Sequence, residues 1–272
     1  MRIKGSTALI TGASSGIGAA LARELGRRGA RVVLLARTAA ALEEVAVAVR
    51  AAGGRADVFP VDLADPAAVE RVAPAVLAQA GAPDLLINNA GVGRWLFLEE
   101  TSAEEAAAMM AVPYFAALAV TRAFLPTMLA SRRRGALVFV NSPAALMPWP
   151  GATAYTGARW ALRGLAEALR ADLHGTRLRV TTVVPGKVSS SYFDNNPGVE
   201  QRIPGLARLL PTITPERAAQ EIVRGVERRQ HLVIFPFLLR ALYHIHAVAP
   251  GPVRWLVAVT GAKRPGGGSF EF

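Results

Sequence analysis

The segment Thr11–Gly18, which reads TGASSGIG, could bind the phosphates of a nucleotide. It places Gly12, Gly16 and Gly18 between an apolar run and a segment of helical period. Glycines in such a turn let the backbone approach a pyrophosphate, and the amides and positive dipole at the helix start stabilise the anion. The spacing G-x-x-x-G-x-G differs from the usual G-x-G-x-x-G, and a glycine triplet alone is as typical of a plain structural turn. The strand–turn–helix context favours the nucleotide.

Arg37 lies two residues after the next apolar run, Arg31–Leu35, where it could set the choice of dinucleotide. A site specific for NAD(H) usually has a carboxylate there for the ribose 2′-hydroxyl, whereas an arginine can pair with a 2′-phosphate. The sequence therefore favours NADP(H) over NAD(H). The alternative is a solvated arginine at the start of a helix.

These residues require a scaffold in which strands and helices alternate. Nearly continuous apolar runs predict strands covered on both faces, at Thr7–Ile10, Arg31–Leu35, Ala56–Pro60, Leu85–Ile87, Ala136–Val140 and Leu178–Val184. Helices are expected between and after them, at Ile17–Arg28, Ala39–Ala52, Pro66–Ala80, Ala103–Ser131, Thr153–His174 and residues 215–229. Glycines expected to form left-handed C-caps follow five of these helices, at Gly29, Gly53, Gly81, Gly135 and Gly175. The alternation predicts an α/β fold, a doubly wound Rossmann-type parallel sheet with helices on both faces, as one domain over residues 1–230.

The composition of the 272 residues excludes several classes of protein. A hydrophobic fraction of 52% excludes a disordered or fibrous chain, and the lack of cysteine excludes a disulfide framework, a thiol nucleophile and Cys-based metal sites. The net charge is +11, but the densest arginine runs, 132–134 and 228–229, fall at expected helix ends, where they complement the helix dipole. No nucleic-acid partner is therefore expected. No stretch has the apolar length of a signal-peptide core or a membrane span, so a cytoplasmic protein is expected.

Further motifs occur in the order and spacing of a known family. Asp62-Leu63 follow the third expected strand, Asn88–Gly91 read NNAG after the fourth, Ser142 precedes Tyr155 by 13 residues, and residues 185–190 read PGKVSS. With TGASSGIG, these motifs make the sequence resemble the short-chain dehydrogenase/reductase family over about residues 5–230. One difference is the serine that replaces threonine at the end of the family's PGxVxT segment.

The resemblance implies a nicotinamide dinucleotide and the residues around it. It assigns cofactor contacts to Gly12, Ser14, Ser15, Gly16, Ile17, Gly18, Arg37, Asp62, Leu63, Asn89, Ala90, Gly91, Tyr155, Arg159, Pro185, Gly186, Val188 and Ser190. In this family a hydride passes between C4 of the nicotinamide and a carbonyl or alcohol carbon. Tyr155 would give a proton to the carbonyl oxygen, or take it from the alcohol, and Ser142 would hold that oxygen by a hydrogen bond. Arg159 completes the implied catalytic set.

Arg159 departs from the family pattern, which has lysine four residues after the tyrosine. A tyrosine is a poor base at neutral pH and needs a nearby cation. Arginine keeps the positive charge and can still donate to the ribose hydroxyls. It does not readily release a proton, however, so a relay that requires a titrating lysine would fail.

Pro113 is a second departure, within the long helix expected at Ala103–Ser131, because the family usually has an asparagine there. That asparagine is associated with a helix kink and an ordered water in the proton path. Proline also kinks a helix and frees a carbonyl one turn earlier, so the bend can persist without the side-chain amide. The alternative is plain drift at a non-essential position.

Both departures affect one proton path and leave two hypotheses. The first is an NADP(H)-dependent oxidoreductase with a modified active site. The second is a nucleotide-binding protein of the same fold with little or no turnover, serving as a sensor or partner subunit. Ser142 and Tyr155 favour the first, because a non-catalytic binder has no chemical need for that pair.

The substrate pocket is expected to be apolar, with a mobile lid at residues 186–215. Its expected lining residues flank the serine or the nicotinamide segment, and they are Leu146, Trp149, Tyr192 and Phe193. A bulky hydrophobic ketone, aldehyde or alcohol fits such a pocket better than a sugar does. Trp95 belongs either to the pocket rim or to the core.

Residues 231–272 form an apolar and basic extension, expected to pack on the same domain or at a subunit interface. The alternative is that it lies on an anionic membrane surface. His244 and His246 are two residues apart, on different faces of a helix, so no metal site is expected there. The resemblance implies a homo-dimer or homo-tetramer formed through Ala103–Ser131 and Thr153–His174.

Overall fold

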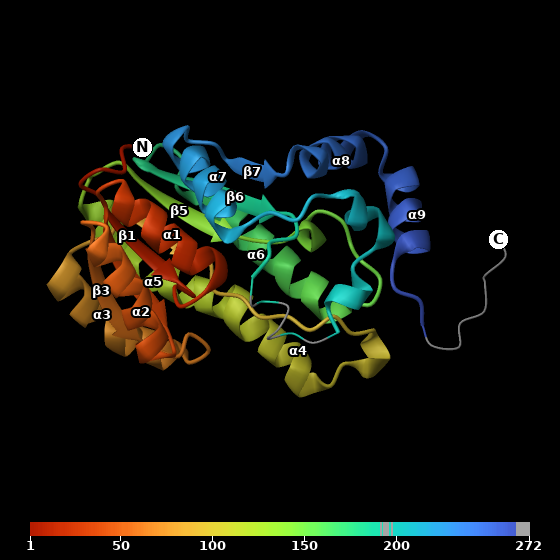
Figure 1. The fold of residues 1–272 in the computed structure, drawn as a ribbon, viewed down its shortest axis with the longest axis horizontal. Helices are drawn as coiled ribbons and strands as arrows, with labels where there is room; N and C mark the ends of the chain where they lie inside the picture. Colours follow the sequence, from red (N-terminus) through yellow and green to blue (C-terminus); the bar gives the residue numbers. More distant parts are fainter. Residues whose placement is uncertain (191, 193–195, 197, 265–272) are drawn as a thin grey trace.

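A seven-stranded parallel sheet forms the centre of the computed structural model, which describes residues 1–190, 192, 196 and 198–264. The strands are β1 (Thr7–Thr11), β2 (Arg31–Ala36), β3 (Arg55–Pro60), β4 (Leu85–Asn88), β5 (Gly135–Val140), β6 (Leu178–Pro185) and β7 (Leu232–Phe235). Their order is β3-β2-β1-β4-β5-β6-β7, and Figure 1 labels the two edge strands, β3 and β7, at opposite ends of the sheet. The expected doubly wound α/β fold is confirmed.

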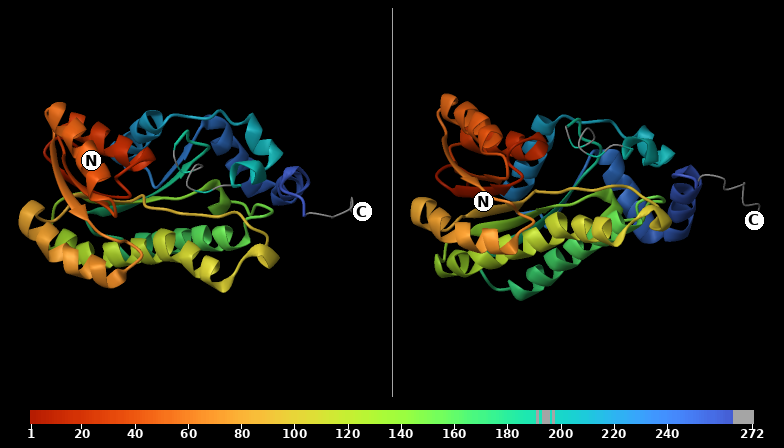
Figure 2. Two further views of the ribbon diagram at one scale, coloured as in Figure 1. Left: turned by 60° about the horizontal axis from the view of Figure 1, so that its bottom comes forward. Right: turned by 90° about the horizontal axis from the view of Figure 1, so that it is seen from below.

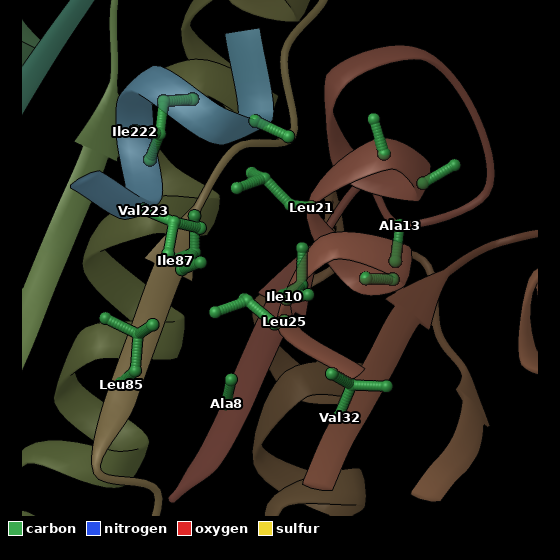
Figure 3. Packing of buried hydrophobic residues seen from close by; sticks show 14 of the residues in the cluster. Ala8, Ile10, Ala13, Leu21, Leu25, Val32, Leu85, Ile87, Ile222 and Val223 are labelled. Atoms are coloured by element: carbon green, nitrogen blue, oxygen red, sulfur yellow. The ribbon is translucent and has the colours of Figure 1, made fainter. Parts of the chain in front are cut away.

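Helices cover both faces of the sheet (Figure 2). One face packs on α1 (Gly16–Arg27), α2 (Ala39–Ala51) and α7 (Pro215–Glu227), and the other on α3 (Pro66–Ala80), α5 (Ala117–Ala130) and α6 (Thr153–Asp172). Side chains alternate along each strand, so Leu9 and Ile10 enter opposite cores. Figure 3 shows the first core, where Ile10 and Ile87 belong to one cluster with Leu21 and Ile222.

The order of the strands reverses beside β1, which pairs with β2 on one side and β4 on the other. The connections that follow β1 and β4 therefore leave the sheet in opposite directions and open a crevice at the carboxyl ends of these strands. Such a crevice is where open α/β sheets bind ligands.

The long helix expected at Ala103–Ser131 is interrupted. It begins as α4 (Ala103–Met110), passes through a π-helical turn, η2 (Ala111–Ala116), and continues as α5. Pro113 lies in that turn, because it has no amide for the α-helical ladder. The whole segment Ala103–Ala130 has the length and hydropathy of a membrane span. Its buried side chains, among them Phe124, pack in the second core, as expected for a core helix.

Glycine caps follow most of the helices as expected. The positive φ angles at these positions belong to Gly29, Gly53, Gly81 and Gly175. Gly135 is the exception, because it is the first residue of β5, and the left-handed turn falls at Arg132, with a φ of 53°. A β-carbon at Gly135 would lie 2.6 Å from the carbonyl oxygen of Asp84, so this glycine is required by close strand packing.

The sheet extends beyond residue 230, where the sequence analysis placed the end of the domain. β7 is its last strand, and α8 (Phe237–Val248) and α9 (Pro250–Thr260) follow. Leu239 of α8 is buried with Val184 and Ile234, and α9 packs through Val253 and Val257. The extension is thus part of the same folded body. Prolines mark the boundaries between its elements, because Pro236 lies between β7 and α8 and Pro250 begins α9.

Candidate active site

A cavity of about 740 Å³ opens at the carboxyl ends of the strands. Residues from the connections after β1, β2, β3, β4, β5 and β6 line it, together with α6 and the segment that follows β6. One continuous space therefore joins the glycine-rich turn to Tyr155. Its volume lies within the range of small-molecule and cofactor sites.

The glycine-rich turn is held in shape by the segment after β4. The Thr11 hydroxyl accepts hydrogen bonds from the amides of Asn89 and Ala90, at 2.9 and 3.0 Å. The side-chain amide of Asn89 donates to the carbonyl oxygens of Thr11, at 3.0 Å, and Gly12, at 3.3 Å. Gly12 has a φ of 64°, and a β-carbon there would lie 2.8 Å from Cα of Ala90. Asn89 thus holds the glycine-rich turn in place through hydrogen bonds to Thr11 and Gly12.

Asn88, the preceding residue, faces the opposite layer. Its side-chain amide donates to the hydroxyl of Thr121 on α5, at 3.0 Å. The two asparagines of the NNAG segment therefore connect β4 to both sides of the sheet. Their different partners follow from the alternation of side chains along a strand.

The start of α1 is free to receive an anion. Ser15 occupies the N-cap position without a side-chain capping bond, and the first turn contains no acidic residue. Gly16 has a φ of 52° and faces Ser190 across the cavity, where a β-carbon would lie 3.3 Å from that of Ser190. Gly18 does not line the cavity, because it packs against the carbonyl of Gly12. Its role is the close approach of turn and helix.

Arg37 lies at the cavity wall just after β2, and it is exposed. Its guanidinium forms no ion pair with any residue that the structure describes. Asp62 and Leu63 line the same end, and the carboxylate of Asp62 accepts the amide of Ala64 at 3.0 Å. This end of the cavity therefore offers one cation that is open to solvent.

Tyr155 and Arg159 form a stacked pair at the other end. Cζ of Arg159 lies 4.9 Å from the centroid of the Tyr155 ring, and only 4% of Tyr155 and 5% of Arg159 are exposed. A β-carbon at Gly91 would lie 2.8 Å from Nη2 of Arg159, so a side chain there would require the guanidinium to shift. Nε of Arg159 is buried and has no hydrogen-bond partner within the described part of the chain.

Ser142 is held close to this pair through its neighbour Asn141. The amide of Ser142 donates to Oδ1 of Asn141 at 2.9 Å, and Nδ2 of Asn141 donates to the carbonyl oxygen of Arg159 at 3.1 Å. Oγ of Ser142 accepts the amide of Ala144 at 3.3 Å, at the start of the 3₁₀ turn η3 (Pro143–Ala145). Asn141 therefore ties the end of β5 to α6. The sequence analysis did not single it out.

Aromatic side chains surround the Tyr155 end. The ring of Trp95 lies 5.1 Å from that of Trp149 and 5.6 Å from that of Tyr155, centroid to centroid. Trp95 is buried and also lines the cavity, so it serves both the core and the pocket. Burial, followed by the charge of the neighbouring Tyr155, raises the pKa of Tyr192. Trp95 and Trp149 contribute apolar surface to this wall, and Ser142, Tyr155 and Tyr192 contribute hydroxyl groups.

The segment after β6 covers the cavity. Val188 bridges to Ile213, and the amide of Ser189 donates to the carbonyl oxygen of Ile213 at 2.9 Å. Oδ1 of Asn196 accepts the amide of Gly93 at 3.1 Å and so ties this cover to the segment after β4. The sequence analysis missed Asn196, because a lone asparagine in a polar loop carries no spacing signal.

An ion pair connects the segment after β6 to another part of the chain. Arg202, on the turn η4 (Glu200–Arg202), pairs with Glu100, on the turn η1 (Leu98–Glu100), at 2.5 Å. Hydrogen bonds from Arg202, and next from the amide of Phe97, lower the pKa of Glu100 to about 2. The pair thus joins the cover to the segment between β4 and α4.

The structure places the predicted site residues unevenly. The predicted cofactor and catalytic residues other than Gly18 line one cavity. Among the expected substrate residues, Trp149 and Tyr192 line it, whereas Leu146 is buried with Val184, Ile234 and Leu239, away from the cavity. Phe193 lies outside the described residues. Apolar residues that line the substrate end without having been predicted are Val112, Ile203, Ala207 and Leu210.

The comparison with protein families matches this arrangement. The family described as "short chain dehydrogenase" matches residues 6–198, which carry most of the cavity lining. The chain belongs to the short-chain dehydrogenase family. A fatty acyl-CoA reductase from Acinetobacter baylyi is 31% identical over 250 residues, or 91% of this chain and 81% of the relative.

Solved structures of the family support the same conclusion. A short-chain dehydrogenase/reductase from Burkholderia phymatum, in complex with NAD, has a TM-score of 0.83 and 26% identity, covering 93% of this chain and 97% of its own. A metagenomic short-chain oxidoreductase in complex with NADP has a TM-score of 0.72 and 34% identity, covering 86% of this chain and 98% of its own. The chain is thus an oxidoreductase of the short-chain dehydrogenase kind, which uses a nicotinamide cofactor.

The residues of this chain fit such a cofactor. Gly12 and Gly91 leave space that a side chain would fill, the start of α1 is uncapped by any side chain, and Nε of Arg159 is a buried donor in need of an acceptor. These features line one cavity, where the turn and the helix start could hold the phosphates and Arg159 could donate to the ribose.

Proposed function

We propose that this protein is an NADP(H)-dependent oxidoreductase for a hydrophobic carbonyl or alcohol, with Tyr155 as the general acid and base. The observation that carries the proposal is the joining of Arg37, Ser142 and Tyr155 by one cavity. Arg37 supports the phosphorylated cofactor, because it is an exposed cation at the wall without an ion-pair partner among the described residues. A carboxylate for a free 2′-hydroxyl does not follow β2 in this sequence.

The bound nicotinamide would supply or accept the hydride at the substrate carbon. The Tyr155 hydroxyl would donate its proton to the carbonyl oxygen during reduction, and the Ser142 hydroxyl would donate a hydrogen bond to the same oxygen. Arg159 places a fixed positive charge 4.9 Å from the Tyr155 ring, where it would stabilise the tyrosinate left behind. Because arginine does not release a proton, the tyrosine would regain its proton from water or solvent-connected groups.

The substrate end favours a bulky apolar molecule. Trp95, Trp149, Ile203 and Leu210 line it, and the groups able to bind a polar oxygen gather near Tyr155. A single carbonyl or hydroxyl at the reacting end of an apolar substrate matches this distribution. The relative from A. baylyi, which is a fatty acyl-CoA reductase, is consistent with a lipid-like substrate class.

The assembly would be a homo-dimer or homo-tetramer formed through α5 and α6. These helices and the preceding turn expose apolar side chains, namely Phe115, Leu118, Leu129 and Trp160. Exposed apolar side chains on neighbouring long helices are typical of subunit interfaces. We also propose that the protein is cytoplasmic.

An equilibrium titration of the purified protein with NADPH and NADH, followed by cofactor fluorescence, tests the proposal. NADPH is expected to bind tightly and NADH weakly, and a series of hydrophobic aldehydes and ketones is then expected to be reduced. Preference for NADH would contradict the assignment of Arg37. Tight NADPH binding without turnover of any hydrophobic carbonyl would favour a nucleotide-binding protein over an enzyme.

A further inference from the structure

The helices α8 and α9 carry exposed apolar side chains. The residues and their exposed fractions are Phe237 (73%), Leu238 (47%), Ile245 (55%), Val248 (88%), Trp255 (62%) and Val259 (44%). We call these six residues the apolar surface. Single exposed apolar residues are ordinary, but six on two consecutive helices indicate an interaction site.

The residues on α8 lie on one face of the helix. Positions 237, 238, 245 and 248 fall on one side of the helix at 100° per residue, whereas Leu239 on the opposite face is buried against the domain. On α9, Val253 and Val257 are buried, and Trp255 faces outward. Each helix therefore uses one apolar face to pack on the protein and presents a second one to solvent.

The charge around this surface has one sign. From Arg228 to Arg264 the sequence contains arginine, lysine and histidine but neither aspartate nor glutamate. Arg240 and Arg254 are exposed on the two helices, and Cζ of Arg240 lies 5.3 Å from the ring centroid of Phe237. The acidic residues near the end of α9, Glu99 and Glu100, are already paired with Arg264 and Arg202.

We propose that α8 and α9 bind the surface of an anionic lipid bilayer, with the apolar surface inserted and the arginines at the headgroups. Helices that lie in a membrane interface combine an apolar face with flanking cations and aromatic side chains, and the charge here is complementary to anionic lipid. A second copy of the chain fits less well. A two-fold interface would bring this basic surface against itself, so that like charges would face one another.

The position of the two helices connects this surface to the candidate active site. Both lie at the end of the molecule opposite α2 and α3 (Figures 1 and 2). Leu206, on the turn η5 (Gly205–Leu209), packs with Val253 and Val257 of α9, and Ala207 of the same turn lines the cavity. The bilayer would thus lie beside the cover of the pocket, and an apolar substrate could enter from the lipid. That consequence rests on the proposed function, whereas membrane binding does not.

Co-sedimentation with vesicles, without nucleotide or substrate, tests the proposal. The wild-type protein is expected to bind vesicles of phosphatidylcholine with 30% phosphatidylglycerol, and to bind pure phosphatidylcholine more weakly. The vesicle affinity of the double variant F237E/V248E should be at least roughly tenfold lower, because charged side chains replace apolar side chains that insert into the bilayer. Arg254→Gln should lower binding about fivefold, and only where anionic lipid is present. Truncation after β7 is unsuitable, because it would remove Leu239 of α8 from its contacts with Val184 and Ile234 and so disturb the core.

Matched controls carry the same changes elsewhere. Val47→Glu on α2 alters an exposed apolar residue, and Arg71→Gln on α3 alters an exposed arginine, both at the other end of the molecule. Neither should change vesicle binding, and circular dichroism with the thermal midpoint verifies that each variant is folded.

Failure of the wild type to bind vesicles, or equal loss in the controls, would overturn the proposal. Unchanged vesicle binding by F237E/V248E, with a smaller mass in sedimentation velocity, would assign the surface to a second copy instead. Vesicle binding by a protein that fails to bind NADPH would overturn the reductase proposal alone.

Discussion

The guanidinium of Arg159 lies over the ring of Tyr155, with its Cζ 4.9 Å from the ring centroid. Gly91 lies beside the same guanidinium, because a β-carbon there would come within 2.8 Å of Nη2. Arginine is a planar, weakly hydrated cation that can stack on an aromatic ring, whereas a lysine ammonium is compact and strongly hydrated. The neighbourhood of Tyr155 is therefore built around arginine.

Replacement of Arg159 by lysine should lower kcat/KM roughly tenfold, because the stacked contact, worth about 1–2 kcal/mol, is lost while the charge is kept. Arg159→Met should lower it further, because the charge is lost as well. Steady-state kinetics with NADPH and a hydrophobic aldehyde measure both. Arg170→Lys, on the same helix but away from the cavity, is the control. A faster Arg159→Lys enzyme would show that the site is not adapted to arginine.

Tyr155→Phe removes the hydroxyl and keeps the ring on which Arg159 lies. Turnover should fall about 10²- to 10⁴-fold, the usual contribution of a general acid or base, while NADPH binding stays within a few-fold. Fluorescence titration and single-turnover kinetics separate the two effects. Tyr114→Phe, in the π-helical turn, supplies the control substitution. If both variants retained turnover, the proton would have to come from another group.

Arg37→Ala should weaken NADPH binding by roughly 10- to 100-fold, because a hydrogen bond to a charged group contributes about 1.5–3 kcal/mol. NADH binding should change little, since NADH has no 2′-phosphate. The comparison uses the two dissociation constants and their dependence on salt. Arg71→Ala, an exposed arginine on α3, should leave both constants unchanged. Equal losses for NADPH and NADH would argue against a contact with the 2′-phosphate.

Glu100→Gln should destabilise the protein in a pH-dependent manner. The pKa of Glu100 is lowered from 4.5 to about 2, chiefly by Arg202, so its contribution to stability is present above pH 4.5 and is lost as the pH falls toward 2. The difference in unfolding free energy between wild type and variant should therefore be constant from pH 7 to 5 and shrink below that. Urea unfolding at several pH values measures it. A difference that grew on acidification would contradict the sign of the shift.

Gly18→Ala should destabilise the fold by roughly 1–3 kcal/mol, because the new methyl group would overlap the carbonyl oxygen of Gly12. Binding of NADPH should weaken with it, since the same turn forms the cavity wall. Gly164→Ala, in α6, has open space around the added carbon and should stabilise by about 0.5–1 kcal/mol. Thermal unfolding of the pair measures the contrast. Equal midpoints would show that the turn relaxes without cost.

The strands that position the candidate site were predictable from the sequence. Five of the first six strands are largely buried apolar runs, and burial on both faces is what makes such runs recognisable. The exception is β3, an edge strand whose residues are partly polar and only partly buried. The glycine-rich turn was predictable because its spacing and position are local. The prediction that Arg37 stands where an NAD(H)-specific site has a carboxylate also needed no structure, because it depends on a single position after β2.

Long-range packing decided what the sequence analysis did not find. Leu146 looks like a pocket residue by proximity to Ser142, but β7 and α8 cover it, and their position was not predictable from the pattern around it. Gly135 was expected as a helix cap, yet the carbonyl of Asp84 requires it inside a strand. Asn196 accepts a hydrogen bond from the amide of Gly93, although the two residues are 103 positions apart in the sequence. Contacts of this kind leave no periodicity to read.

The two asparagines after Ile87 have a consequence for how the length of this segment can vary. Asn88 bonds to α5 on one side of the sheet and Asn89 to the glycine-rich turn on the other. Insertion or deletion of a single residue within β4 would exchange their directions, and both connections would be lost together. The strand is therefore expected to accept an exchange of one apolar residue for another but not a change in the number of its residues.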